Sequence, residues 1–203
     1  AEFCSACGTR IKVWSGVTKG QQKWFTKFNW QGHPFCLTVL PQLFTGYSTQ
    51  VQTIMEKIAS RSGHILVYGE KGVGKTTLLR WLADNLGKDN HAIYVARPPI
   101  NFDDLIKLIA SELKANKLFG KDNKITLYEI EALVKKAKKP VVILLDEAHE
   151  FAPEIEQQMR SLGDIPGVNF ILAGLPAARD KIKQESPPFF DRIILEVYLD
   201  HLE

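Results

Sequence analysis

The sequence contains no stretch near the ~20 consecutive apolar residues that a membrane-spanning helix needs, so we expect no membrane segment. The first residues also lack the basic region, apolar core and small-residue cleavage site of a secretory signal, which speaks against secretion. These two absences predict a cytoplasmic location. Methionine is missing from the first position, so a targeting segment that was trimmed away stays open as an alternative.

Cysteine is scarce, since the chain has only three, and all of them lie within the first 36 residues. The remaining composition is that of a globular protein, with 45% apolar and 24% charged residues. A length of 203 residues allows one main domain and a small module. We therefore expect a module at residues 1–40 and a domain at residues 41–203.

Acidic residues are rare in the first 40 positions, where five basic residues stand against Glu2 alone. That segment carries a charge of +4, whereas the whole chain carries +3, so the remaining residues sum to −1. Positive charge that is concentrated in a small module favours a polyanionic partner.

The cysteines occur in two spaced pairs with a histidine. Cys4 and Cys7 form a C-x2-C motif, and after 25 residues His33 and Cys36 form an H-x2-C motif. Two such turns present four soft or borderline ligands, which suit tetrahedral Zn²⁺. We therefore predict a zinc site of these four residues, in a module that resembles a zinc ribbon. Two alternatives stay open: a disulfide between Cys4 and Cys7, and buried thiols with an unrelated surface histidine.

Aromatic residues alternate with lysines in the same segment, at Trp14, Trp24, Phe25, Phe28 and Trp30. This composition is typical of a surface that stacks bases and neutralises phosphates. It is equally typical of the small core that such a module needs. Residues 1–40 are therefore interpreted as a contact for DNA or for a protein partner, and a purely structural role for the aromatic residues stays open.

One octapeptide fits the pattern G-x-x-x-x-G-K-[ST]: Gly69, Glu70, Lys71, Gly72, Val73, Gly74, Lys75 and Thr76. An apolar run precedes it and a helical pattern follows from Thr77, so its glycines fall in a strand-to-helix turn. Such a turn points backbone N–H groups and the positive end of a helix at one place, which suits a polyphosphate. We predict that the octapeptide and Thr77 bind ATP, with Lys75 at the β and γ phosphates and Thr76 at Mg²⁺.

Strand-like and helix-like segments alternate along the rest of the chain. The predicted strands are 65–68, 91–96, 141–145, 170–173 and 193–198. The predicted helices are 50–60, 76–86, 102–115, 126–138, 154–162 and 176–184. This alternation predicts an α/β fold, a three-layer P-loop NTPase with a parallel sheet between helices, which binds its ligand at the carboxyl ends of the strands.

Two carboxylates, Asp146 and Glu147, directly follow the third predicted strand. About 70 residues after a phosphate loop, such a pair predicts hydrolysis, with Asp146 completing the Mg²⁺ shell and Glu147 orienting and deprotonating the attacking water. With His149 the sequence reads Asp-Glu-Ala-His, a string of one helicase superfamily that also needs a second ATPase lobe. We therefore interpret His149 as an ordinary loop residue.

These features together resemble the AAA+ ATPases, and most of all the branch of origin-recognition, helicase-loader and transposition ATPases. The resemblance covers residues 45–198 and rests on the segments 69–80, 146–147 and 160–176. It implies an ATPase that assembles as a homo-oligomer when ATP is bound. In place of the family's polar sensor at the end of the fourth strand, this sequence has an apolar stretch, and Asn169 lies at that strand's start. Together with a zinc ribbon, the resemblance suggests a source in an archaeal virus or mobile element.

An arginine near the last strand is the residue with which this family reaches a neighbouring subunit's nucleotide. The segment 189–193 resembles that motif, so the resemblance implies that Arg192 is a catalytic finger acting in trans. A surface salt bridge from Arg192 to Asp191 or Glu196 stays open as an alternative. Weaker candidates for the finger are Arg160 and Arg179.

Two functions follow from these predictions. The leading one is Mg²⁺-dependent ATP hydrolysis that acts on DNA or assembles with it, in replication initiation, helicase loading or transposition. The alternative is a nucleotide-dependent signalling or scaffold switch that hydrolyses ATP slowly and recruits proteins through residues 1–40. The family's helical lid is absent or was not retained beyond Glu203, which favours the alternative, whereas the intact Glu147 favours hydrolysis.

Overall fold

The computed structural model describes residues 46–61, 63–113 and 125–201, and the predicted zinc site at residues 4–36 lies outside them. Within the described residues, five strands form one fully parallel sheet in the order β2-β3-β4-β1-β5. The strands are β1 (His64–Gly69), β2 (His91–Val95), β3 (Val141–Leu145), β4 (Val168–Gly174) and β5 (Ile193–Leu199). Each predicted strand is therefore present.

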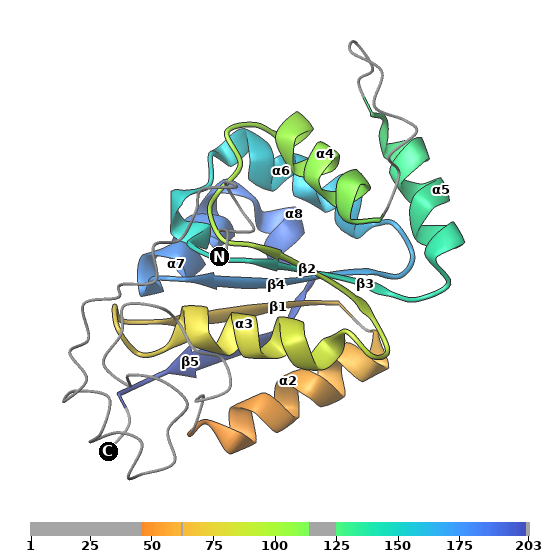
Figure 1. Cartoon of the computed structure of the whole chain (residues 1–203). Coiled ribbons are helices and arrows are strands. Elements are labelled where there is room, and N and C mark those ends of the chain that lie inside the picture. Colours follow the sequence, from red (N-terminus) through yellow and green to blue (C-terminus); the bar gives the residue numbers. More distant parts are fainter. Residues whose placement is uncertain (1–45, 62, 114–124, 202–203) are drawn as a thin grey trace, which may run out of the picture. The chain divides into compact units, whose positions relative to one another are not determined.

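Helices cover both faces of the sheet (Figure 1). One face carries α2 (Ser48–Ser60) and α3 (Lys75–Leu86). The other face carries α4 (Phe102–Glu112), α5 (Leu127–Ala137), α6 (Pro153–Gly163), α7 (Pro176–Glu185) and the short α8 (Pro187–Phe190). These three layers confirm the predicted fold class.

The central strand β3 shows how the sequence builds both cores, because its five residues are all buried. Ile143 and Leu145 pack in the core beneath α4, α5 and α6, whereas Val142 and Leu144 pack beneath α2 and α3. This alternation follows from the two-residue period of a strand. Because both faces are covered, the strand reads as a continuous apolar run.

Helix boundaries follow local capping chemistry. The Thr126 hydroxyl accepts a hydrogen bond from the backbone N–H of Glu129, whose carboxylate accepts one from the N–H of Thr126, so α5 begins with a capping box. The Asn101 side chain accepts a hydrogen bond from the N–H of Asp104 at the start of α4, as expected for a helix start. Helix α6 begins at Pro153, one residue before the predicted boundary.

Two short elements were not predicted. A single 3₁₀ turn, η2 (Ala148–Glu150), follows the acidic pair, and α8 has only four residues. Neither is long enough to show helical periodicity, and α8 begins with two prolines, which favour a helix start but give no apolar pattern. Within the described residues, no helix is both long and apolar enough to cross a bilayer.

Candidate functional site

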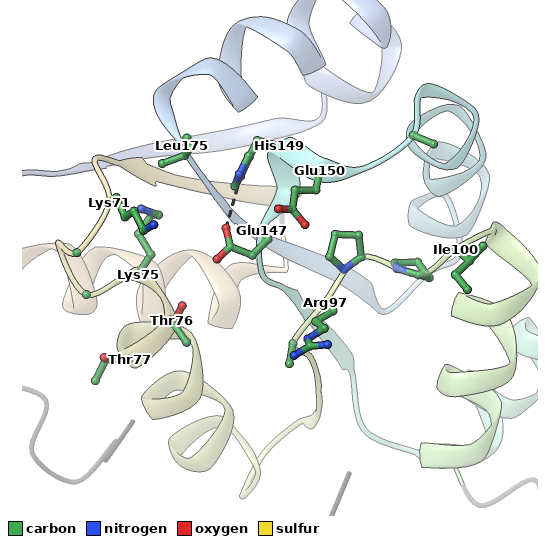
Figure 2. Close-up of a pocket in the computed structure, with 16 residues that line it drawn as sticks. Lys71, Lys75, Thr76, Thr77, Arg97, Ile100, Glu147, His149, Glu150 and Leu175 are labelled. Carbon is green, nitrogen blue, oxygen red and sulfur yellow. Dashed lines mark ion pairs between the residues drawn. The ribbon is translucent and has the colours of Figure 1, made fainter. Parts of the chain in front are cut away.

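A cleft of about 1070 Å³ opens at the carboxyl edge of the sheet, where the loops after β1, β2, β3 and β4 meet (Figure 2). This is the edge at which open parallel sheets bind ligands. The loop after β1 and the start of α3 provide Lys71, Lys75, Thr76 and Thr77, and the loop after β3 provides Glu147, His149 and Glu150. The loop after β2 adds residues 96–100, and the loop after β4 adds Leu175.

The phosphate loop joins β1 to α3 through two glycines in the left-handed region. Gly72 has φ 92° and Gly74 has φ 96°, and a Cβ added at either would meet no atom within 4 Å. Gly74 is also the N-cap of α3 and has no side chain that could cap the helix. The first N–H groups of α3 therefore remain available to an anionic ligand at the positive end of the helix.

Gly69 is needed for a different reason, which is close contact with β5. A Cβ at Gly69 would lie 2.3 Å from the backbone oxygen of Leu199, its register partner. The Tyr47 hydroxyl also contacts both the phosphate loop and the residue after β5. It lies 3.0 Å from the backbone oxygen of Val73 and forms a hydrogen bond with the backbone oxygen of Asp200. The phosphate loop is thereby attached to the end of β5.

Lys75 lies at the start of α3 and is 8% exposed. Its ammonium donates to the backbone oxygens of Gly69, at 2.9 Å, and Glu70, at 2.8 Å. Burial lowers the pKa of Lys75, although the nearby carboxylates of Glu147, Asp146 and Glu70 act to raise it. A phosphate group that binds in the loop would offer this ammonium a charged partner in place of two carbonyl groups.

Asp146 follows β3 and is 2% exposed. One carboxylate oxygen accepts the backbone N–H of Glu147 at 3.0 Å, and the other accepts the Tyr94 hydroxyl at 3.0 Å. A carboxylate has about four acceptor positions, so two hydrogen bonds do not exhaust it. Thr76 lines the cleft, whereas Asp146 lies buried at the end of β3 and is not part of the cleft lining. A hydroxyl and a carboxylate are oxygen donors of the kind that Mg²⁺ prefers.

Glu147 has the left-handed backbone conformation φ 55°, ψ 42°, which is uncommon for a residue other than glycine. Figure 2 shows its carboxylate in the cleft, where it is 3.6 Å from Nδ1 of His149. Such strain costs about 1 to 3 kcal/mol and is found most often at functional sites. Here it turns a half-exposed carboxylate toward the space that a ligand would occupy.

The loop that carries Glu147 is held from α7 by Lys181. The Lys181 ammonium donates to the backbone oxygens of His149, at 3.4 Å, and Phe151. It also pairs with Glu156 at 3.5 Å, whose pKa is raised by burial, although Lys181 opposes that rise. Three elements, the loop, α6 and α7, are thus joined at one partly buried cation.

Asn169 does not take the place of the missing polar sensor. Its amide donates to the backbone oxygen of Gly63 at 2.7 Å, at the amino end of β4, and the cleft lies at the other end of the sheet. The carboxyl end of β4 contributes Leu175, which is apolar. No polar side chain from β4 lines the described part of the cleft.

Arg192 lies just before β5, at the amino edge of the sheet, and does not line the cleft. Nε and Nη2 are each 2.8 Å from one oxygen of Asp164, and Nη1 donates to the Pro188 oxygen at 2.6 Å. The alternative prediction, a salt bridge from Arg192 to Asp191 or Glu196, is therefore wrong. The loop after α6 brings Asp164 beside the start of β5, whereas Glu196 pairs with Arg179 of α7.

Three residues near the site were not predicted as site residues: Arg97, His149 and Tyr94. Arg97 lies two residues after the end of β2, so its place after a parallel strand was an available signal. His149 is part of the Asp-Glu-Ala-His string and was interpreted as a loop residue. Tyr94 lies within a short strand, and no motif distinguishes it.

A family model described as "AAA domain" matches residues 57–182, which is more than half of the chain. Among curated proteins, the chain is similar to General secretion pathway protein A of Aeromonas hydrophila. The two are 29% identical over 130 residues, which make up 60% of this chain and 24% of that protein. The chain thus spans about a quarter of that relative.

Among solved structures, the chain is similar to the Aeropyrum pernix ORC2 protein, with a TM-score of 0.56 and 18% identity over 74% of this chain and 46% of that one. It is similar to Cdc6p from Pyrobaculum aerophilum, with a TM-score of 0.58 and 18% identity over 82% and 48%. A chain of Drosophila ORC bound to poly(dA/dT) DNA and Cdc6 gives a TM-score of 0.57 and 11% identity over 76% and 29%. At these identities the likeness concerns the fold, and this chain spans half or less of each protein.

Proposed function

This chain belongs to the AAA domain family and is a P-loop ATPase, and from that premise we propose that it couples Mg²⁺-dependent ATP hydrolysis to assembly on DNA. The observation that carries the hydrolysis is the convergence of Lys75, Thr76 and Glu147 on one cleft. They come from the loops after β1 and β3, which are not neighbours in the sheet order. A site that only bound nucleotide would not need a strained carboxylate in this position.

In this proposal the phosphate loop and the start of α3 hold the triphosphate of ATP, and Lys75 neutralises charge on its β and γ phosphates. Thr76 and Asp146 hold Mg²⁺, which supplies further positive charge to the phosphates when bound. Glu147 accepts a proton from a water molecule, whose oxygen forms a bond to the γ phosphorus. The bond from that phosphorus to ADP then breaks, which releases phosphate and ADP.

The DNA part of the proposal rests on two supports. Structures with the same fold include Drosophila ORC bound to poly(dA/dT) DNA and Cdc6. The segment 1–40 carries a charge of +4 in this chain, and a basic segment attracts the phosphates of nucleic acid. The described domain would then hydrolyse ATP while residues 1–40 provide a second contact, to DNA or to a protein.

Phosphate release measured with and without duplex and single-stranded DNA tests this proposal. The expected result is that DNA raises the turnover of the wild type. Glu147→Gln should keep ATP binding but lose about 10² to 10⁴-fold in turnover, since it cannot accept the proton. If the wild type turns over ATP at the same rate with and without either DNA, the coupling to DNA is rejected.

We further propose that Arg192 acts on the nucleotide of a second subunit. Arg192 lies at the edge opposite the cleft and so cannot reach the nucleotide site of its own subunit. This place is compatible with action in trans. Wild-type turnover per subunit should then rise with protein concentration. Arg192→Ala should remove that rise, with a loss of about 10³ to 10⁵-fold in turnover. Lys107→Ala, which removes an exposed cation on α4, is the control. Equal activity of Arg192→Ala and wild type at every concentration would exclude the finger.

A second candidate function is a slow nucleotide switch that recruits proteins, and two observations favour it. The curated relative is General secretion pathway protein A, whose name refers to secretion rather than to DNA. The carboxyl end of β4 also offers the apolar Leu175 to the cleft instead of a polar sensor. In the turnover experiment this function predicts slow hydrolysis that DNA does not change.

The zinc site of Cys4, Cys7, His33 and Cys36 is likewise a proposal. Elemental analysis of the untagged protein should find one zinc ion per chain. Cys36→Ser should lower that content and should unfold residues 1–40, because structural zinc contributes to the folding of small modules. A wild-type protein without stoichiometric metal would exclude the site.

A further inference from the structure

A chain of three side chains connects helix α3 to the acidic end of β3. Nε of Arg80 lies 3.5 Å from the Tyr94 hydroxyl, and its guanidinium carbon lies 5.5 Å from the centre of the Tyr94 ring. The Tyr94 hydroxyl donates to Oδ2 of Asp146 at 3.0 Å. Tyr94 belongs to β2, so the contact joins residues 52 positions apart in the chain.

Arg80 lies four residues after Thr76, so both side chains project from the same face of α3. The two groups proposed to hold Mg²⁺ come from different elements, Thr76 from α3 and Asp146 from the end of β3. Arg80 and Tyr94 bridge those two elements. This link bears on Mg²⁺ binding because the ion demands near-ideal octahedral geometry from its ligands.

We propose that Tyr94, supported by Arg80, is a positioning residue that orients the Asp146 carboxylate and thereby sets the affinity of the nucleotide site for Mg²⁺. The inference rests on the proposed function, in which Asp146 and Thr76 hold the ion. Tyr94 itself does not touch the nucleotide or the ion in this arrangement. It acts by occupying Oδ2, while the backbone N–H of Glu147 occupies Oδ1, so both oxygens have fixed directions.

The geometry suits a lasting hydrogen bond from the Tyr94 hydroxyl to Asp146. Because Asp146 is 2% exposed, little water can take the place of the phenol. Outer-shell partners of this kind change metal affinity by about 10 to 100-fold when they are removed.

The test compares ATP affinity in Mg²⁺ with ATP affinity in excess EDTA, by titration calorimetry on the whole chain. Tyr94→Phe removes one oxygen atom and keeps the ring under Arg80. The expected result is unchanged ATP affinity in EDTA and a gain in affinity from Mg²⁺ that is about tenfold or more smaller than in wild type. Tyr128→Phe is the matched control, because Tyr128 is 84% exposed at the start of α5 and should behave as wild type.

A merely structural role for Tyr94 predicts a different pattern. If the role is only structural, Tyr94→Phe should lower the midpoint of urea unfolding, or weaken ATP binding equally with and without Mg²⁺. Either result overturns the proposal if the gain in ATP affinity from Mg²⁺ is the same as in wild type. If Tyr94→Phe does not fold, Arg80→Lys gives the second test. Loss of the planar guanidinium should then weaken the Mg²⁺ effect by a smaller factor than Tyr94→Phe is expected to.

The binding measurement does not depend on turnover. If the wild type binds ATP more tightly in Mg²⁺ but does not hydrolyse it, the proposed hydrolysis fails and the role of Tyr94 is still tested. If Mg²⁺ does not change the ATP affinity of the wild type, the proposed Mg²⁺ site fails, and the role of Tyr94 fails with it. Equal Mg²⁺ effects in wild type and Tyr94→Phe overturn the positioning role alone.

Discussion

The two edges of the sheet differ in what their polar side chains contact. At the carboxyl edge, Glu147 is turned into an open cleft by a strained backbone, and Arg97 lines the same cleft. At the amino edge, Arg192 is bound to Asp164, and Asn169 to the Gly63 oxygen. Glu147 and Arg97 thus face a space that a ligand could occupy, whereas Arg192 and Asn169 are hydrogen-bonded to other protein groups within this chain.

Among variants that compare the two edges, the largest difference should come from replacing one lysine at each edge by alanine. Lys75→Ala at the carboxyl edge removes the charge proposed to face the phosphates, and ATP turnover should fall by about 10² to 10³-fold or more. Lys139→Ala at the amino edge removes a bond to the Lys88 oxygen and should leave turnover unchanged. Phosphate release by both variants checks the comparison, and similar losses in the two would contradict it.

Acid should lower the free energy of unfolding because of His64, a buried residue at the amino edge. Burial, together with the nearby charge of Arg192, lowers the pKa of His64 to about 4, although Asp164 acts to raise it. The unfolded chain, with a histidine pKa of about 6.5, takes up the proton first, so stability is full above that pH and falls as pH drops toward 4. The loss should approach about 3 kcal/mol by the lower pKa.

Urea unfolding at several pH values measures this loss. Nδ1 of His64 accepts the backbone N–H of Phe170 at 3.3 Å, and the side-chain oxygen of an asparagine can do the same. His64→Asn should therefore be less stable at neutral pH but should lose most of the dependence on pH in this window. A variant that keeps the full dependence would show that other groups are responsible.

Asn169 gives a smaller effect that separates a structural role from a sensing role. Asn169→Leu removes the bond to the Gly63 oxygen and should cost about 1 to 3 kcal/mol of stability. Because Asn169 is at the edge opposite the cleft, ATP turnover per folded molecule should not change. Turnover measured well below the unfolding midpoint decides this, and a large loss there would place Asn169 in the sensing machinery.

The smallest effect should come from the pair of Arg192 and Asp164. Both side chains are partly exposed, at 33% and 49%, and such pairs contribute no more than about 1 kcal/mol. Asp164→Asn should therefore change the free energy of unfolding slightly, and high salt should reduce the difference further. Urea unfolding at low and high salt measures it. A loss of several kcal/mol would mean that the amino edge depends on this single pair.

Sequence patterns predicted the carboxyl edge better than the amino edge, for physical reasons. The phosphate loop and the acidic pair are contiguous motifs, so their residue types and flanks already place them at strand ends. The bond from Tyr94 to Asp146 joins residues 52 positions apart and depends on strand order, which no local pattern contains. The pair of Arg192 and Asp164 likewise depends on where the loop after α6 ends.

The length of each helix and strand also limited what could be predicted. Continuous apolar runs and regular helical spacing identified the strands and the long helices. Helix α8 and the turn η2 are too short for any period to be visible, yet η2 sets the direction of the Glu147 loop. The strained conformation of Glu147 could not be predicted from the sequence, because glutamate has no intrinsic preference for the left-handed region.

The contact of Gly69 with Leu199 has a mechanical consequence. Gly69 and the Leu199 oxygen are too close for any side chain, and Tyr47 bonds to both the loop and the Asp200 oxygen. A pull or a twist on the end of β5 is therefore transmitted directly to the first residue of the phosphate loop. A displacement of this strand end would therefore move the backbone of the loop that is proposed to bind the triphosphate.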